Sequence, residues 1–255
     1  KIVSSYISVK TENTDKAKAM DRSPVRPAVL VLGGTGFIGR HVAAALRASG
    51  CRVLVGSRSP ARHRHRQDAD GWREVRMDRA TQATDWSSVL HGCDAVVNCV
   101  GILRPRGHET YQRVHHLGPA ALAAACARRG LRLVHVSALG LAESMRSHFL
   151  RSKRDGEAAL RASGADWHIV RPSLLDGDGG FGARWIRRVA RWPLHPLPRG
   201  AIGKLAVLDV RDLGEAIANL VLDPSPARRE HDLGGLQVRT LAEHFAALRA
   251  LHAST

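Results

Sequence analysis

The chain has 255 residues, which suffices for one large α/β domain or for one domain with a small appendage. Hydrophobic residues make up 44%, enough to bury a full core, and the formal net charge is +16. That charge would suit phosphates, nucleic acid or an anionic membrane. The basic residues are spread along the chain, however, and no motif interleaves them with aromatic side chains. We therefore interpret them as a solvated surface and do not expect nucleic acid as a partner.

The beginning of the chain and its cysteines restrict the class of protein further. Residues Lys1 to Pro27 are polar and contain no apolar signal core, which predicts a disordered leader or extension. No apolar run reaches the roughly 18 residues of a membrane-spanning helix. The four cysteines, at positions 51, 93, 99 and 126, have no CxxC spacing. We expect reduced, buried thiols in a cytoplasmic compartment, and neither a disulfide framework nor a metal site.

The first predicted elements are an apolar strand, a glycine-rich turn and a helix. Ala28 to Leu32 is apolar throughout, and Gly33, Gly36 and Gly39 follow at regular spacing. The first glycine permits a sharp turn, the second the approach of a pyrophosphate, and the third close packing of helix and strand. The helix, Phe37 to Ser49, presents free N–H groups and its positive dipole end to phosphates. We therefore expect the dinucleotide to contact Gly33, Thr35, Gly36, Phe37, Ile38, Gly39 and Arg40.

The end of the second strand, Cys51 to Gly56, indicates which dinucleotide binds. NAD sites usually place a carboxylate about 20 residues past the first glycine, where it accepts from the ribose 2′-OH. No carboxylate occurs between Gly50 and Gln67, and Arg58 stands near the expected position. Because a guanidinium suits a 2′-phosphate, NADP(H) is favoured over NAD(H), with Arg40 as a second candidate. We interpret Arg62, Arg64 and Arg66 as part of an exposed loop, and we do not expect His63 and His65 to bind a metal.

The third and fourth strands are expected to contribute to the same site. The third, Trp72 to Met77, ends at Asp78, whose carboxylate either accepts from the adenine amino group or caps a turn. The fourth, Asp94 to Val100, runs into a glycine. In a doubly wound sheet the nicotinamide ribose lies near the C-terminal ends of the strands. The candidate contacts at the end of the fourth strand are therefore Cys99, Val100 and Gly101.

Helices and strands continue to alternate as far as Pro172, and this alternation defines the fold class. A long helix, His108 to Arg129, precedes a strand at Leu131 to Ser137. A helix at Ser147 to Ser163 precedes the strand Ala165 to Arg171, which Pro172 ends. Short connections between alternating elements predict an α/β protein with a doubly wound parallel sheet, a Rossmann domain over residues 28–175.

The composition changes after Asp176, and we expect a small C-terminal cap region over residues 176–255. Gly182 to Arg191 predicts a basic amphipathic helix with Trp185, Val189 and Trp192 on its apolar face. Such a helix either packs over the substrate cleft or lies on an anionic membrane. The remaining elements are predicted at Lys204 to Leu208, Val210 to Leu222, His231 to Leu233 and Thr240 to Leu251, with residues 204–222 returning to the main sheet.

Several motifs together resemble those of atypical, extended short-chain dehydrogenases/reductases. They are GGTGFIG from Gly33, NCVG from Asn98, VSALG from Val136, the FLRSK segment, RPS from Arg171 and VLDVRDLGEAI from Val207. NCVGIL, VHHLGP and SKRDGE more closely resemble one branch of that family. This branch holds the nucleotide-binding accessory subunit of respiratory complex I and its bacterial relatives, some linked to ubiquinone biosynthesis. The resemblance covers Ala28 to about Leu248 and implies an NAD(P)-binding, epimerase/dehydratase-like Rossmann fold with Pro172 near the cofactor.

The same resemblance implies a catalytic set that this chain retains only in part. Catalytic members use a Tyr four residues before a Lys as general acid/base, and a Ser that polarises the substrate carbonyl. Ser137 and Lys153 match, and the resemblance also implies that Lys153 contacts the nicotinamide ribose. Phe149 occupies the Tyr position and has no transferable proton. His115 stands in place of the usual Asn, and we expect Tyr111 to be a packing residue.

We therefore predict an NADP(H)-binding protein with a structural, assembly or sensing role linked to respiratory or quinone metabolism. The alternative is an active NADPH-dependent oxidoreductase or epimerase-like enzyme in which His148 or a water supplies the proton. Expected partners are the dinucleotide, a small hydrophobic carbonyl or quinone, and a membrane surface or protein complex. We expect a cytoplasmic protein, to which the resemblance adds a peripheral position on the inner membrane.

Overall fold

The computed structural model describes residues 26–63, 69–142, 146–190, 192, 202–226 and 228–253, with residues 181–184 and 251–253 described for the backbone only. Nearly all of the predicted leader lies outside this part of the chain. So do Arg64, His65 and Arg66 of the basic run, and Arg191 of the predicted amphipathic helix.

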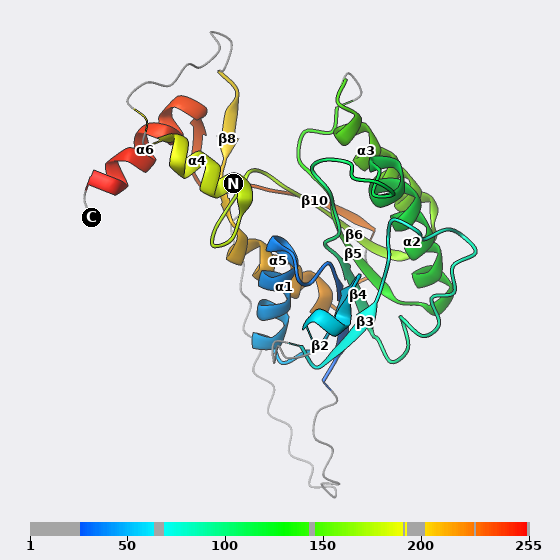
Figure 1. Ribbon diagram of the computed structural model, residues 1–255. Coiled ribbons are helices and arrows are strands. Elements are labelled where there is room, and N and C mark those ends of the chain that lie inside the picture. Colours follow the sequence, from blue (N-terminus) through cyan, green and yellow to red (C-terminus); the bar gives the residue numbers. More distant parts are fainter. Residues whose placement is uncertain are drawn as a thin grey trace, which may run out of the picture.

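A seven-stranded parallel sheet forms the centre of the described chain, in the order β10-β6-β5-β4-β1-β2-β3 (Figure 1). The strands are β1 Ala28–Leu32, β2 Arg52–Ser57, β3 Gly71–Glu74, β4 Ala95–Asn98, β5 Arg132–Val136, β6 Asp166–Pro172 and β10 Arg229–Leu233. The order along the chain reverses between β1 and β4, which creates the switch point where ligands bind in such sheets. The predicted doubly wound α/β fold is confirmed.

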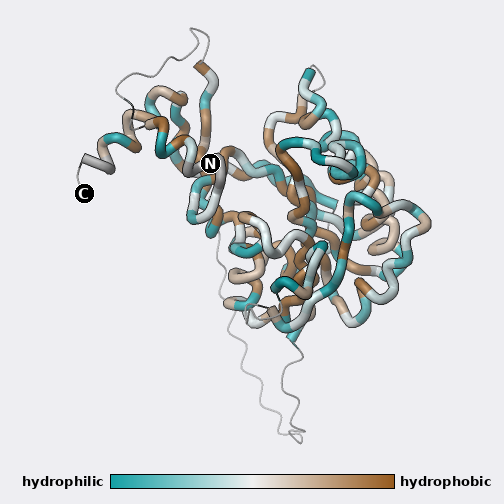
Figure 2. The backbone as a smooth tube through the Cα atoms, in the orientation of Figure 1, coloured by the Kyte–Doolittle hydropathy of each residue, from teal (hydrophilic) through white to brown (hydrophobic). Residues whose placement is uncertain are grey.

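Helices cover both faces of the sheet. One face carries α1 Phe37–Ala48 and α5 Val210–Leu222, and the other carries α2 Gly118–Arg129 and α3 His148–Ala162. Strand β1 contributes to the core on both faces. Val29 and Val31 pack with residues of α1 and α5, whereas Leu30 and Leu32 pack with residues of α2 and α3. All five side chains of β1 are buried, as expected for a parallel strand covered on both faces. Figure 2 shows the resulting concentration of hydrophobic segments in the sheet.

Side-chain caps explain where two of the helices begin. The Asp209 carboxylate accepts from the Arg211 N–H at the start of α5. Thr240 and Glu243 exchange hydrogen bonds at the start of α6 Leu241–Ala253, which is a capping box. These local signals lie in the sequence itself, so the N-termini of both helices lie within one residue of their predicted positions.

The predicted long helix His108 to Arg129 starts later and in a different form. A π-helix, η2 Gln112–Leu117, leads directly into α2. Helix α3 approaches η2 so closely that a Cβ on Gly156 would lie 2.0 Å from the carbonyl oxygen of His115. Gly156 therefore brings the face of α3 that carries Lys153 against the segment that carries His115. A short 3₁₀ helix, η1 Pro60–His63, follows β2.

The C-terminal residues form a smaller lobe beside the sheet (Figure 1). It contains α4 Phe181–Ala190, α6, and the antiparallel pair of β8 Lys204–Ala206 with β11 Val238–Thr240, while β7 Leu175–Asp176 pairs with β9 Leu208–Asp209. The strand predicted at Lys204 to Leu208 is thus divided at Val207 between two small sheets. Helix α5 packs on the main sheet, and β10 joins its edge.

The prediction of the apolar face of the basic helix is wrong for its two tryptophans. Val189 does pack inward, together with Ile186, against the small core of this lobe. Trp185 and Trp192, however, are 57% and 54% exposed. The inward face is therefore defined by Ile186, Val189 and Ala190, and the tryptophans stand on the surface. Among the described residues, no helix combines the length and the apolar character needed to cross a membrane.

Candidate functional site

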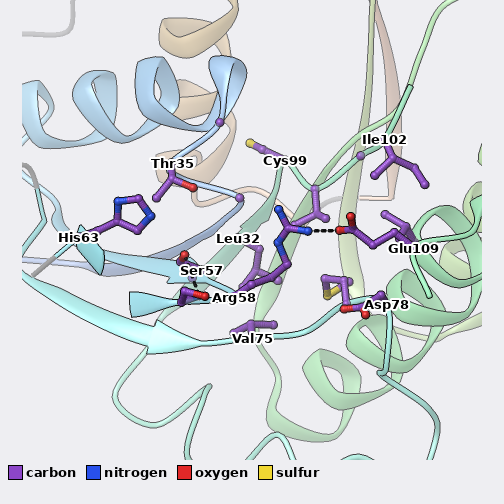
Figure 3. A pocket seen from close by; sticks show the side chains of 18 of the residues that line it. Leu32, Thr35, Ser57, Arg58, His63, Val75, Asp78, Cys99, Ile102 and Glu109 are labelled. Carbon is purple, nitrogen blue, oxygen red and sulfur yellow. Dashed lines mark hydrogen bonds and ion pairs between the residues drawn. The ribbon is translucent and has the colours of Figure 1, made fainter. Parts of the chain in front are cut away.

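A cavity of about 350 Å³ opens at the C-terminal ends of β1, β2 and β4, at the switch point of the sheet (Figure 3). The predicted cofactor contacts that line it are Gly33, Thr35, Gly36, Arg58, Asp78, Cys99, Val100 and Gly101. These residues come from four separate segments of the chain. The fold therefore brings together the glycine turn, the end of β2, the segment after β3 and the end of β4.

The glycine turn has the geometry that its spacing predicted. Gly33 has a φ of +73°, which only glycine adopts readily, and this turns the chain out of β1. A Cβ on Gly39 would lie 2.2 Å from the carbonyl oxygen of Gly33, so helix and turn touch at their backbones. Gly36 caps α1 without a side-chain hydrogen bond, and no acidic residue occupies the first turn. The first N–H groups of α1 therefore remain available to an anion.

Asp78 is a buried carboxylate at the end of the cavity opposite Thr35 of the glycine turn (Figure 3). The residue is 3% exposed, and neither carboxylate oxygen has a hydrogen-bond donor within the described residues. Arg76 Nη2 and Arg79 Nε lie 3.6 and 4.0 Å from Oδ2, beyond hydrogen-bond distance. A buried acceptor without a donor is costly unless something else supplies one. The adenine amino group is such a donor, so Asp78 fits a dinucleotide, and the alternative of a turn cap lacks the hydrogen bond that it requires.

Arg58 extends from the end of β2 into the cavity and forms an ion pair with Glu109 on the opposite wall (Figure 3). Arg62 and His63 also line the cavity, which corrects the interpretation of Arg62 as part of an exposed loop. The His63 ring stacks on Trp72, with 5.6 Å between ring centroids. Basic side chains thus collect on the β2 side of the cavity, where the adenosine half of a dinucleotide binds in this fold.

Six of the predicted cofactor contacts are not among the residues that line the cavity. Arg40 instead donates to the carbonyl oxygen of Asp178 in the loop before α4, and Phe37 packs against Gly180 of the same loop. Arg40 is therefore committed to holding this loop and is a poor candidate for a 2′-phosphate. The predicted contacts outside the cavity lining are Phe37, Ile38, Gly39, Arg40, Lys153 and Pro172.

Lys153 of α3 stands behind the cavity wall at Gly101. Its Nζ lies 3.9 Å from the position that a Cβ on Gly101 would occupy. The side chain is 8% exposed, and Nζ donates to the carbonyl oxygen of Val136 at 3.3 Å. Burial lowers the pKa of Lys153 to about 8, although the Glu157 carboxylate acts in the opposite direction. The ammonium group is thus close to the part of the cavity predicted to hold the nicotinamide ribose.

Phe149 lies beside Lys153 and places an aromatic ring next to the ammonium group. The ring centroid lies 5.9 Å from Lys153 Nζ. Tyr111 and His115 pack around the same ring, with centroids 5.8 and 5.3 Å from that of Phe149. The Tyr111 hydroxyl donates to the carbonyl oxygen of Leu103 at 2.8 Å, so it is already engaged. Tyr111 packs as predicted, and this aromatic cluster offers no free phenol beside Lys153.

His115 links the loop after β4 to helix α3. Its Nε2 accepts from the N–H of Ile102 at 3.0 Å, which places the remaining ring proton on Nδ1. Nδ1 then donates to Ser152 Oγ at 2.9 Å, and Ser152 Oγ donates to the carbonyl oxygen of Phe149 at 2.8 Å. Burial, together with Lys153, lowers the pKa of His115 to about 3, so the imidazole is neutral. His115 holds the wall of the cavity in place and has no ring nitrogen left for a ligand.

Ser137 lies at the end of β5, next to a buried ionic network. Its hydroxyl has no well-formed hydrogen bond within the described residues, although it lies close enough to Glu157 to help lower the pKa of that carboxyl group. Burial is the largest single influence and tends to raise the pKa of Glu157, but hydrogen bonds from Arg171, the nearby Ser137 hydroxyl and the charges of Arg171 and Arg161 together hold the pKa below its usual value. Arg171 Nε donates to Glu157 at 2.8 Å, and Arg171 also pairs with Glu230. Lys153 thus has a fixed carboxylate neighbour.

His148 does not face the cavity. It lines a separate hollow on the outer side of α3, together with Tyr111 and Arg151. Its Nδ1 lies 3.0 Å from Arg151 Nη2. The structure therefore brings Lys153 and Phe149 together beside the dinucleotide cavity but leaves His148 apart from it.

Sequence reasoning missed part of the cavity wall. The missed lining residues are Leu32, Gly56, Ser57, Ser59, Arg62, His63, Val75, Met77, Ile102, Glu109 and Val114. Ser57 and Ser59 flank Arg58, so their contribution was foreseeable from that position. Glu109 carries no local signal, because only the path of the loop after β4 brings it opposite Arg58. The four cysteines are free thiols, and the described residues contain no cluster of metal ligands.

The fold and the cavity together define a Rossmann-type dinucleotide-binding protein. A family model described as NAD(P)H-binding matches residues 33–212, and the chain belongs to this family. The matched region includes the glycine turn, Arg58, Asp78 and Lys153.

Curated relatives agree with this assignment. The chain is 31% identical over 201 residues to a ceramide reductase of Caulobacter vibrioides, covering 77% of this chain and 60% of the relative. It is 28% identical over 232 residues to NADH dehydrogenase [ubiquinone] 1 alpha subcomplex subunit 9, mitochondrial, of Dictyostelium discoideum, covering 84% of this chain and 60% of that protein. The chain thus spans about 60% of the length of these two relatives. The predicted resemblance to complex I subunits is confirmed.

Solved structures share the fold at lower sequence identity. MoeE5 in complex with UDP-glucose and NAD superposes with a TM-score of 0.68 at 21% identity, covering 88% of this chain and 81% of that one. UDP-glucuronic acid 4-epimerase from Bacillus cereus in complex with NAD gives a TM-score of 0.69 at 17% identity, covering 89% and 85%. The epimerase-like architecture expected from the sequence is therefore confirmed.

Proposed function

We propose that this chain binds NADP(H) and holds it without the tyrosine-dependent proton transfer of related reductases. The role would be structural, assembly-related or sensing, in respiratory or quinone metabolism. One observation carries the proposal: the Phe149 ring lies beside Lys153, and the nearby hydroxyl groups of Tyr111 and Ser152 already donate to carbonyl oxygens. The site thus combines a complete phosphate cradle with an incomplete proton pathway.

Charge supports the choice of NADP(H). Arg58, Arg62 and His63 all line the β2 side of the cavity. A guanidinium forms bidentate, charge-assisted hydrogen bonds with a phosphate, whereas it cannot accept from a ribose hydroxyl. A 2′-phosphate at this end of the cavity would therefore gain contacts that NAD(H) cannot make.

The remaining groups suit binding and orientation of the nicotinamide half. A bound nicotinamide coenzyme would supply or accept a hydride. Lys153 would donate to the nicotinamide ribose, and the resemblance assigns Ser137 to the substrate carbonyl. Phe149 has no proton that it could transfer to the substrate. Loss of a general acid typically lowers a rate by about 10²- to 10⁴-fold, which is compatible with binding that serves a purpose other than turnover.

Titration with NADPH and NADH, followed by tryptophan fluorescence, tests the cofactor proposal. Trp72 is a suitable reporter because it stacks on His63, which lines the cavity. We expect tighter binding of NADPH than of NADH, and we expect Arg58→Ala to remove most of that difference. Arg40→Ala is the matched control, since Arg40 lies outside the cavity lining. Equal affinity for both coenzymes, or no binding of either, would contradict the proposal.

A second candidate function is that of a working NADPH-dependent reductase for an apolar carbonyl compound. The name of the Caulobacter vibrioides relative, ceramide reductase, favours it. A water would then supply the proton, because His148 lines a separate hollow. Wild-type NADPH oxidation with hydrophobic ketones or quinones, unaffected by His148→Ala, would support this candidate over the first. Absence of turnover by a protein that binds NADPH would exclude it for those substrates.

The smaller lobe is a candidate for contact with a membrane or a protein complex. Trp185, Arg188 and Trp192 are exposed on or just after α4. Tryptophan suits the interfacial region of a bilayer, and arginine suits anionic headgroups. The complex I subunit relatives make attachment to a respiratory assembly the alternative form of this proposal. We expect a protein peripheral to such a membrane.

A further inference from the structure

The ion pair between Arg58 and Glu109 spans the cavity that the proposed function assigns to the dinucleotide (Figure 3). The two residues come from opposite walls, one following β2 and the other in the loop after β4. Both residues line the cavity. The Arg58 side chain is 60% exposed and that of Glu109 26% exposed, so water and a ligand can reach the pair.

Glu109 is held in position by its backbone. Arg106 and Glu109 exchange backbone hydrogen bonds of 3.0 and 2.9 Å across a turn in which Gly107 has a φ of +55°. The loop that carries this turn is fixed at its start, where the N–H of Ile102 donates to His115. It is fixed again where the Tyr111 hydroxyl donates to Leu103. The Glu109 carboxylate therefore lies on a loop that these hydrogen bonds hold in position, and not on an unconstrained surface segment.

From this geometry we infer that Glu109 is a specificity-determining residue of the dinucleotide site, competing with a ligand's 2′-phosphate for Arg58. The inference rests on the proposed function, which assigns the 2′-phosphate to Arg58. A guanidinium engaged by a carboxylate must give up that partner, or share it, when a phosphate binds. A phosphate would also be repelled by the Glu109 charge if the carboxylate stayed in place. Glu109 therefore penalises ligands with a 2′-phosphate and leaves ligands without one less affected.

Competition between Glu109 and a 2′-phosphate for Arg58 predicts both the direction and the size of a change in ligand affinity. Removing the Glu109 charge frees Arg58, so affinity for a 2′-phosphate should rise. Partly exposed ion pairs are weak, which limits the gain to about twofold to fivefold. Affinity for the same nucleotide without the 2′-phosphate should change by less than about twofold. The two changes together distinguish competition for Arg58 from a general effect on the cavity.

Calorimetric titration of the full chain with 2′,5′-ADP and with 5′-AMP tests the inference. Glu109→Gln retains the size of the side chain and removes its charge. Glu215→Gln is the matched control, because it removes one negative charge from an exposed position on α5, away from the cavity. We expect Glu109→Gln to tighten 2′,5′-ADP selectively and Glu215→Gln to leave both affinities unchanged. In an Arg58→Ala background, Glu109→Gln should lose most of its effect, because only the direct repulsion between the Glu109 charge and the phosphate remains to be removed.

The outcomes separate this inference from the proposed function. A wild-type protein that binds neither probe, or both equally, contradicts the choice of NADP(H) itself and with it the inference. A wild-type preference for 2′,5′-ADP that Glu109→Gln leaves unchanged overturns the inference alone. Weaker binding of 5′-AMP to Glu109→Gln also overturns it, since Glu109 would then accept from the ribose hydroxyls. Thermal unfolding of each variant shows whether a lost affinity reflects a lost fold.

Discussion

The ammonium group of Lys153 lies 5.9 Å from the centre of the Phe149 ring, and both side chains come from helix α3. They are four positions apart in the sequence, so they stand on one face of the helix, one turn apart. In the reductases that this chain resembles, that spacing joins a lysine to a tyrosine. The geometry of the pair is therefore present, and only the hydroxyl is missing.

Phe149→Tyr is expected to create or greatly raise NADPH oxidation with carbonyl or quinone substrates. The added phenol would lie near the Lys153 ammonium group, which stabilises its ionised form. A restored general acid corresponds to a gain of about 10²- to 10⁴-fold, measurable as loss of NADPH absorbance. Phe149→Leu is the control, because it removes the ring without adding a hydroxyl. If Phe149→Tyr binds NADPH but turns over no faster than wild type, the missing hydroxyl does not limit the activity.

Gly39→Ala is expected to abolish dinucleotide binding and to destabilise the fold. The new Cβ would lie 2.2 Å from the carbonyl oxygen of Gly33, so α1 would have to move away from the turn. Overpacking of this kind costs about 1–3 kcal/mol in the free energy of unfolding. Gly203→Ala is the matched control, since no atom lies within 4 Å of its added Cβ. Urea unfolding and NADPH titration measure the two effects, and unchanged binding by Gly39→Ala would refute the proposed fit of turn and helix.

Stability is expected to fall as the pH is lowered from about 6.5 towards 3. Burial lowers the pKa values of His115 and His135 to about 3 and that of His168 to about 4. In this range the unfolded chain binds protons that the folded chain excludes, so acid favours unfolding. Each histidine contributes on the order of 2 kcal/mol of lost stability at pH 5.

Urea unfolding at pH 7 and pH 5 measures this dependence. His168→Gln should reduce the slope of stability against pH, because it removes one of the three groups. His91→Gln is the control for the substitution itself, because His91 is an exposed histidine. A wild-type stability that stays constant between the two pH values would show that these histidines are not held neutral by burial.

Sedimentation with anionic vesicles tests the surface role of the smaller lobe. We expect the wild type to bind vesicles, and we expect salt to weaken that binding because part of it comes from charge. Trp185→Ala combined with Trp192→Ala should reduce the bound fraction several-fold. Leu117→Ala is the control, since Leu117 is an exposed apolar residue of the main domain. A wild-type protein that stays in the supernatant at low salt would leave a protein partner as the remaining interpretation of these tryptophans.

The local parts of the site were predictable from the sequence. Gly33 and Gly39 follow an apolar strand at a spacing that only a strand–turn–helix unit explains, and the structure places them accordingly. The same holds for Arg58, whose distance from the glycine turn is set by one helix and one strand. Trp185 and Trp192 were placed wrongly, because periodicity shows that a helix has an apolar face but not which apolar residues its neighbours will cover.

The amino-acid sequence by itself determined the Rossmann fold, the phosphate cradle and the spacing of Phe149 four positions before Lys153. These features depend on residue type and on short spacings along one chain segment. Only the tertiary structure decided that Glu109 faces Arg58, that Asp78 is buried without a donor among the described residues, and that His148 lies outside the cavity. Each of these depends on how separate segments pack across the sheet. Contacts between residues about fifty positions apart, such as Arg58 and Glu109, leave no periodic signal in the sequence.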